Sequence, residues 1–201
     1  VAAPSLTTIG GNISTTDSAI TLGTVTLGAN TVLDTNATAT NTADIAIGQV
    51  TGSAFDLTLK TGAGIANANV SSAGGTGFGT LAFQDVGGTA TVNGFVTGTA
   101  ITGDNTVVNL AVTAHGNSTT GAFAPTNTGT LVLGSGGGTQ TYGGGVNLTG
   151  VGGVRTLNGT VQSNGNTIST GAITLGSNTT LDTTMGAGGP VPAGAGVSID
   201  A

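Results

Sequence analysis

One stretch of this chain is written twice. Residues 23–35, GTVTLGANTVLDT, return 148 positions later as residues 171–183, GAITLGSNTTLDT. The match extends upstream without a gap, because Gly11 and Ile20 align with Gly159 and Ile168. Such self-similarity indicates a chain assembled from copies of one supersecondary unit. We therefore expect related modules at about 10–35 and 158–183 within a single repetitive segment that spans residues 1–201.

The repeated unit has the pattern of short strands joined by turns. Thr alternates with Val, Ile or Leu, and the alternation stops at Gly or Asn, which favour turns. Short runs of the same kind recur along the chain, and most are bounded by Gly, Asn, Asp or Ser. They lie at 19–22, 24–27, 44–47, 55–59, 80–83, 89–92, 107–112, 130–133, 146–149, 155–157, 167–169, 172–175 and 179–182.

Composition narrows the fold class to all-β. Gly accounts for 39 of the 201 residues, charged residues for 5%, and Glu is absent. A chain with so few good helix formers and so many β-branched residues disfavours helices. Disordered chains combine low hydrophobicity with high charge, whereas here the mean hydropathy is +0.32 and the net charge is −6. The chain has no Cys, so disulfides and thiolate metal sites are excluded.

Two all-β architectures accommodate many short strands. In a β-solenoid each strand stacks on its equivalent one coil below, and the alternative is an antiparallel β-sandwich or barrel. An aromatic content of only 3%, small or β-branched apolar residues and the long-period repeat favour the solenoid. With roughly 20 residues per coil we expect about ten coils and a rod of roughly 50 Å. The repeated segment would then return to the same face of the rod seven coils along.

Two segments resemble repeats of giant bacterial surface proteins. Residues 138–148, GTQTYGGGVNL, and residues 172–183, AITLGSNTTLDT, are similar to the strand repeats of filamentous-haemagglutinin-like and autotransporter-type adhesins. The resemblance is clearest in 130–201 and in 10–35. It implies a right-handed parallel β-helix, export across a bacterial envelope, and a role as a stalk or adhesive element at the cell surface.

Catalysis is disfavoured by the scarcity and scatter of reactive side chains. The only His, His115, lies in a Gly/Asn-rich turn, and no two Asp residues are closer than ten positions. Sugar-cleaving sites need paired carboxylates. Stacking could bring Asp34 and Asp44, or Asp44 and Asp56, together, but turn capping is the simpler role for these residues. We therefore predict that the protein is not an enzyme and assign no catalytic, cofactor-binding or metal-binding residue.

Glycine-rich segments do not complete a known ion or phosphate motif. A calcium roll needs Asp after Gly-Gly-x-Gly-x, whereas Gly79 stands there after Gly74, and residues 136–138 and 143–145 also lack the Asp. A phosphate loop needs Gly before its Lys, but Lys60 follows Leu59. Lys60 and Arg155 are the only fixed cations, too few to bind nucleic acid. No apolar run is long enough to span a bilayer.

Thr-x-Thr pairs raise the possibility of a flat water-ordering or sugar-binding face. They begin at Thr24, Thr38, Thr89, Thr97, Thr126 and Thr139, with irregular spacings of 14, 51, 8, 29 and 13 residues. A matching face needs a row at constant coil spacing, so an ice- or glycan-binding module ranks below a structural role. Tyr142 and the five Phe residues do not form such a row in the sequence either.

The sequence as a whole favours a structural extracellular β-solenoid, a stalk or scaffold of a bacterial surface adhesin. The alternative is a fibre subunit that stacks end to end, because neither end of the chain has an obvious polar cap and residues 196–201 read as the start of another strand. Expected partners are further copies through the uncapped ends, or a cell-surface glycan or protein, without cofactors. Leu175 and Leu181 are expected to face the core.

Overall fold

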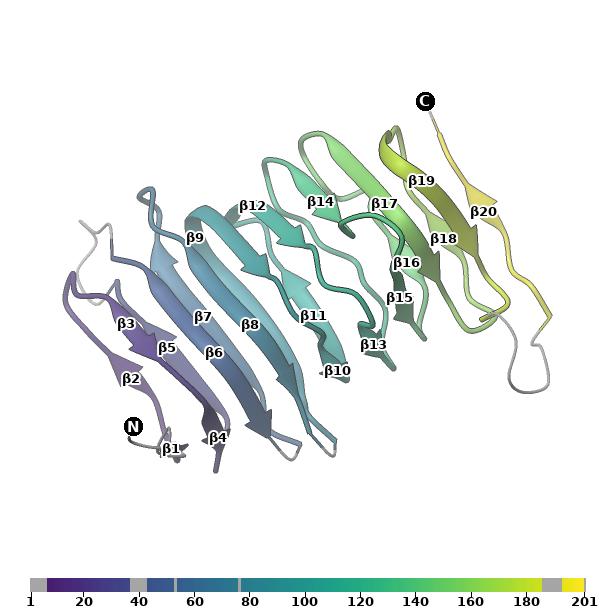
Figure 1. The fold of residues 1–201 in the computed structure, drawn as a ribbon. Coiled ribbons are helices and arrows are strands. Elements are labelled where there is room, and N and C mark those ends of the chain that lie inside the picture. The colour runs from purple at the N-terminus through teal and green to yellow at the C-terminus, as the bar shows by residue number, and fades with distance from the viewer. Residues whose placement is uncertain (1–6, 37–42, 53, 76, 186–192, 201) are drawn as a thin grey trace.

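The protein is a β-solenoid of about eight turns whose strands are parallel (Figure 1). The computed structural model describes residues 7–36, 43–52, 54–75, 77–185 and 193–200, and these contain strands and turns but no helix. The described part of the chain therefore offers no helix with the length and hydrophobicity of a membrane-spanning segment. The predicted solenoid is confirmed, and the antiparallel sandwich is excluded.

Each coil contributes up to three strand segments, which stack into three rows along the rod. Row A begins with the pairing of Ile20 and Ile45 and continues to the pairing of Leu157 and Leu175. Its strands are β3 (Ile20–Leu22), β6 (Ile45–Gly52), β8 (Ala68–Gly74), β9 (Thr80–Val92), β12 (Val107–Val112), β14 (Leu131–Leu133), β17 (Arg155–Gln162) and β19 (Thr174–Asp182).

Row B follows row A within each coil and shares four of its strands. The later residues of β6, β8, β17 and β19 belong to row B, as in the pairing of Val25 with Val50. The strands confined to row B are β1 (Thr7–Ile9), β4 (Val25–Leu27), β10 (Thr97–Gly98), β13 (Ser118–Thr119) and β15 (Thr139–Tyr142).

Row C closes the coil. It includes the first residues of β9 and, as a separate three-stranded sheet at the C-terminal end, β16, β18 and β20. A bridge between Phe123 and Val146 continues the row towards that sheet. The strands of row C other than β9 are β2 (Ile13–Ser14), β5 (Thr31–Asp34), β7 (Leu57–Gly62), β11 (Ala100–Gly103), β16 (Val146–Asn147), β18 (Ile168–Ser169) and β20 (Val197–Ser198).

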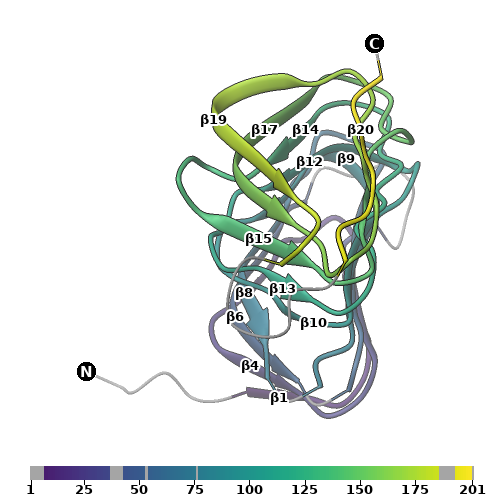
Figure 2. The ribbon, with the colours of Figure 1, turned by 90° about the vertical axis from the view of Figure 1, so that its right-hand side faces the viewer.

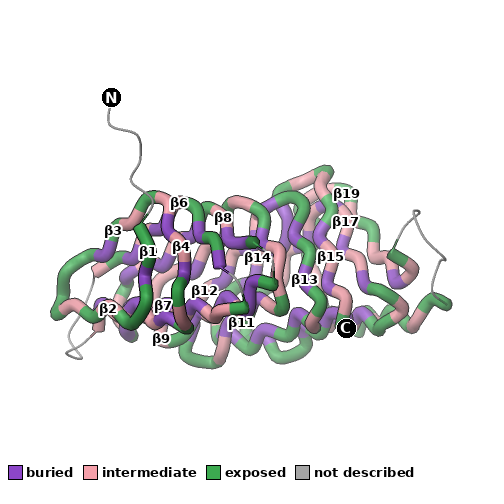
Figure 3. Tube along the Cα trace, turned by 90° about the horizontal axis from the view of Figure 1, so that it is seen from below, coloured by how far each residue is buried: buried purple, intermediate pink, exposed green. Residues whose placement is uncertain are grey.

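Apolar columns fill the interior, because alternate residues of each strand face inward. Figure 3 shows the resulting alternation of buried and more exposed residues along the strands. One column in row A runs through Leu22, Ile47, Val70, Val92, Val112, Leu133, Leu157 and Leu175. Such like-on-like stacking lets small β-branched side chains and Leu bury a continuous core without large rings in every coil.

A polar cluster interrupts the apolar column of row B halfway along the rod. Gln140 and Asn117 are about 1% exposed. The Oε1 of Gln140 accepts hydrogen bonds from the Tyr142 hydroxyl at 2.6 Å and from the Asn117 amide at 3.2 Å. The Oδ1 of Asn117 accepts from the Val96 N–H at 2.7 Å, and the Gln140 amide donates to the Val112 carbonyl at 3.0 Å. The cluster is therefore satisfied, as burial requires.

The coils are longer and less regular than the sequence suggested. Thr7 pairs with Val25, whereas Ile168 pairs with Val197, so a coil contains from 18 to 29 residues. The rod therefore makes about eight turns instead of the expected ten. The extra residues lie between the strands, at corners where chain length does not alter the ladder.

The repeated segment does return after seven coils, but to a different row. The pairings stack Leu175 over Leu22, whereas the repeat aligns Leu175 with Leu27 of row B. The expectation of a shared face was wrong because unequal corners accumulate a shift of one strand position.

Leu175 does not have the buried position expected of it. It ends its column with no described residue of the chain stacked above it, and it is 61% exposed. Leu181 is half-buried and packs against the core. Figure 2 shows this last coil, with β19 and β20, facing the viewer.

Candidate functional site

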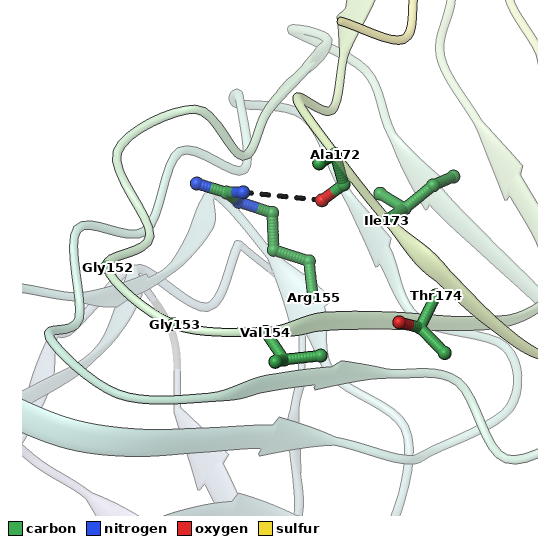
Figure 4. Close-up of a pocket in the computed structure, with 7 residues that line it drawn as sticks. All are labelled: Gly152, Gly153, Val154, Arg155, Ala172, Ile173 and Thr174. Carbon is green, nitrogen blue, oxygen red and sulfur yellow. Dashed lines mark hydrogen bonds between the residues drawn. The ribbon is translucent and has the colours of Figure 1, made fainter. Parts of the chain in front are cut away.

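Both fixed cations are engaged in structural contacts. Lys60 pairs in register with Asp34, and its Nζ lies 3.8 Å from a carboxylate oxygen of that residue. Arg155 lies where row C turns into row A, and its guanidinium donates hydrogen bonds to backbone carbonyls (Figure 4). The acceptors are Leu148 at 2.7 Å, Ala172 at 3.3 Å, Thr149 at 3.4 Å and Val151. Little of either cation is left to attract an anion.

The hollow beside Arg155 is a feature of the corner. It has a volume of about 420 Å³ and is lined by Gly152, Gly153, Val154, Arg155, Ala172, Ile173 and Thr174. Val154 is 57% exposed, and the guanidinium donors turn to the corner carbonyls. Because the guanidinium satisfies carbonyls of two neighbouring coils, we assign this residue to holding the corner together.

The Asp residues singled out in the sequence act as caps of backbone N–H groups. Asp44 Oδ1 accepts from the Asn67 N–H at 2.7 Å, and Asp56 Oδ1 accepts from the Thr80 N–H at 2.6 Å. Asp34 Oδ1 accepts from the Asn36 N–H at 2.7 Å. The capping role is confirmed for these three residues. Within the described ranges no group of three His, Cys, Asp or Glu side chains could hold a metal ion.

His115 contacts a serine on the next coil. Its Nε2 lies 3.2 Å from the Ser135 hydroxyl, and both residues are exposed. The imidazole lies against the backbone of Gly138, where an added Cβ would meet Nδ1 at 1.6 Å. Gly136 and Gly137, with φ of +92° and +67°, shape the loop that brings these groups together. The contact joins two neighbouring corners.

The outward side of row B carries a row of hydroxyls that the sequence does not reveal. Register pairings place in one column Thr8, Thr26, Thr51, Gly74, then Thr97, Ser118, Thr141, Gln162 and Asp182. The bridge between Ala73 and Val96 joins the two parts of the column. Six of these nine positions bear a Thr or Ser hydroxyl at the constant spacing of the ladder, about 4.8 Å per coil.

Two hollows that share residues form a trough along this hydroxyl row. The first, of about 350 Å³, is lined by Gly75, Gly77, Phe78, Thr97, Gly98, Thr99, Ser118 and Thr120. The second, of about 230 Å³, is lined by Ser118, Thr119, Thr120, Thr141, Gly143, Asn164 and Met185. Ser118 and Thr120 belong to both, so the two hollows meet. We call the combined surface the row B trough.

The Thr-x-Thr pairs divide between faces. The pairs that begin at Thr24, Thr97 and Thr139 lie on row B, and the pair at Thr89 lies on row A. The pair at Thr38 lies outside the described residues. Coils of unequal length hide the row, because a constant step in space corresponds to steps of 18 to 25 residues in the chain. The stated objection to a regular row was therefore wrong.

Comparisons with known proteins returned no relative. No protein-family profile, no curated protein and no solved structure matches this chain.

Proposed function

We propose that this chain is a non-enzymatic structural element, the stalk or scaffold of a bacterial surface adhesin. The observation that supports this role is the stacking of row A through seven successive register pairings, from Leu22 to Leu175. The hydrogen bonds between coils run along the rod axis. A pulling force along that axis is shared by all three rows, which suits an element that holds a binding tip away from a cell.

An extracellular location is part of the same proposal. The chain has one ion pair among its described residues, no Cys, and cations that are held in backbone or carboxylate contacts. A fold stabilised by backbone ladders and apolar columns depends little on salt or redox conditions. The resemblance to bacterial surface repeats favours the same compartment. Antibody labelling of intact and permeabilised cells of the source organism tests it, and labelling only after permeabilisation would contradict it.

End-to-end stacking into a fibre is the second candidate. Three apolar side chains end their columns at the last coil without cover from the described residues, namely Leu175, Val197 and Ile199, which are 61%, 45% and 57% exposed. An open strand edge beside such residues is a template for another chain. A second copy stacked there would extend the ladder and bury all three.

Electron microscopy of the purified chain across a concentration series distinguishes the two candidates. Filaments with an axial repeat near about 4.8 Å that disappear in Leu175→Lys would support the fibre. Single short rods at every concentration would support the stalk. Val108→Lys, at an exposed position of row A away from the ends, is the matched control. Compact particles without an axial repeat would contradict both candidates.

A further inference from the structure

The row B trough is hollow because glycines occupy positions where neighbouring coils carry side chains. Gly74 stands in the hydroxyl column between Thr51 and Thr97, and a Cβ there would lie 2.6 Å from the Thr97 hydroxyl oxygen. Gly143 occupies the position that Thr120 takes one coil earlier. The surface is therefore a dented channel rather than a flat array. From Gly75 to Asn164 the trough spans four coil steps, roughly 19 Å.

Polar groups of the trough are neutral. Its lining offers the hydroxyls of Thr97, Thr99, Ser118, Thr120 and Thr141, together with the amide of Asn164. Each hydroxyl can both donate and accept a hydrogen bond. None of the lining residues is charged, and both fixed cations of the chain are engaged elsewhere. A ligand of this channel is therefore neutral and rich in hydrogen-bonding groups.

An exposed aromatic ring lies beside the channel. Phe95 is 48% exposed and two residues before Thr97, so it lies on the same outward side of row B. Its Cε2 is 3.8 Å from the Cβ position of Gly74, which places the ring at the edge of the hollow. A phenyl ring exposed among hydroxyls is suited to the apolar C–H face of a sugar, whose hydroxyls point outward from the ring.

A buried hydroxyl on the channel adds a further unsatisfied group. The Oγ1 of Thr119 is buried and has no hydrogen-bond partner among the described residues, and Thr119 lines the second hollow. Buried hydroxyls are usually paired with protein or water. This group marks the place where a bound hydroxyl or water completes the structure.

We propose that the row B trough binds a neutral, linear polysaccharide that lies along the rod axis. Phe95 stacks on one sugar face, and the hydroxyls of Thr97, Ser118 and Thr120 exchange hydrogen bonds with successive sugar units. The proposal goes beyond the scaffold role and does not depend on it. Ice is the competing ligand, but a dented channel with glycines at 74 and 143 lacks the flat, uninterrupted array that a crystal face requires.

The test is retention of the whole chain on insoluble neutral polysaccharides, namely microcrystalline cellulose, chitin and an insoluble α-glucan. The variants are Phe95→Ala and the double variant Thr97→Val/Thr120→Val, which keeps side-chain shape and strand propensity but removes two hydroxyls. The matched control is Thr21→Val/Thr91→Val, on the outward side of row A. Thermal melting of every variant confirms that the fold is retained.

We expect at least one of the three polysaccharides to retain the protein, with about tenfold weaker binding for each trough variant and no change for the control. Loss of two hydrogen bonds of ordinary net strength accounts for that factor. Retention by none of the three, or equal retention of wild type and both trough variants, would overturn the proposal. Incorporation into growing ice that is lost in the double variant, without retention on polysaccharide, would assign the trough to ice instead.

Discussion

Tyr142 is the residue on which the middle of the core depends. Its ring stacks on Phe123 with centroids 4.7 Å apart and an interplanar angle of 21°, and its hydroxyl donates to Gln140. The ring is fully buried. An inverse ladder of amides in place of apolar side chains ties β13 to β15 here, because Asn117 and Gln140 occupy successive coils of one column. Buried polar partners of this kind specify one register over a slipped one.

The first prediction concerns alkaline pH. Burial raises the pKa of Tyr142 far above its ordinary value. The tyrosine of the unfolded chain ionises near pH 10, whereas the folded state keeps its proton, so the free energy of unfolding falls as pH rises above about 10, with a limiting slope of about 1.4 kcal/mol per pH unit. Urea unfolding at several pH values measures this slope.

Tyr142→Phe is the matched variant for that experiment. It keeps the stack on Phe123 but removes one hydrogen bond, so we expect about 1 kcal/mol lower stability at pH 7 and a shallower alkaline slope. Because the chain has only one Tyr, tyrosinate absorbance reports on this residue alone. Tyrosinate that appears near pH 10 while the circular dichroism remains that of the folded protein would contradict the buried position.

At the scale of elements, the strands follow from the sequence wherever Val, Ile or Leu alternates with Thr. The runs at 24–27, 107–112 and 130–133 correspond to β4, β12 and β14. β8 and β15 were missed. Their sequences, ANVSSAG and TQTY, are mostly small or polar residues. They are strands because neighbouring coils supply partners on both sides, such as Ala68 between Ile45 and Ala90. Tertiary pairing here outweighs local propensity.

Corners between elements are where close backbone approach decides the residue. A Cβ at Gly87, in the bend of β9, would lie 1.8 Å from the Gly64 carbonyl oxygen one coil below. We therefore predict that Gly87→Ala lowers the free energy of unfolding by about 1–3 kcal/mol, the usual cost of overpacking. The displaced backbone would also disturb the Gly62–Val86 pairing that precedes the bend.

Gly23→Ala provides the control for this substitution. A Cβ at Gly23 meets nothing within 4 Å, so we expect unchanged or slightly higher stability, since Ala restricts the unfolded chain more than Gly does. Midpoints of urea unfolding measure both variants. Equal midpoints for Gly87→Ala and Gly23→Ala would mean that the corner backbone is not as close-packed as described.

For the molecule as a whole, the sequence predicted the solenoid but not its dimensions. The composition, the short runs and the repeated segment were sufficient to favour stacked parallel strands. The number of coils and the row of the second repeat were wrong, because corner lengths between 18- and 29-residue coils cannot be read from local patterns. The same irregularity concealed the row B trough, whose members Thr97, Ser118 and Thr141 are neighbours only through register.

Position along the rod decides how much an apolar residue contributes to stability. Leu157 is fully buried directly beneath Leu175, which is 61% exposed. We predict that Leu157→Asp unfolds the protein, because an unpaired carboxylate would be buried in the column. Leu175→Asp should alter the melting temperature little. Far-UV circular dichroism during heating measures both, and similar loss of structure in the two variants would contradict the open last coil.

The separation of corner length from coil height makes the rod a ruler. Residue number along the chain sets how far a corner loop extends, whereas the count of coils alone sets its height, in divisions of about 4.8 Å. Peptides grafted into the corners of two chosen coils would therefore be held at an axial separation fixed in advance, whatever their own lengths. The molecule thus offers a graduated support on which the spacing between two attached groups is selected by whole numbers.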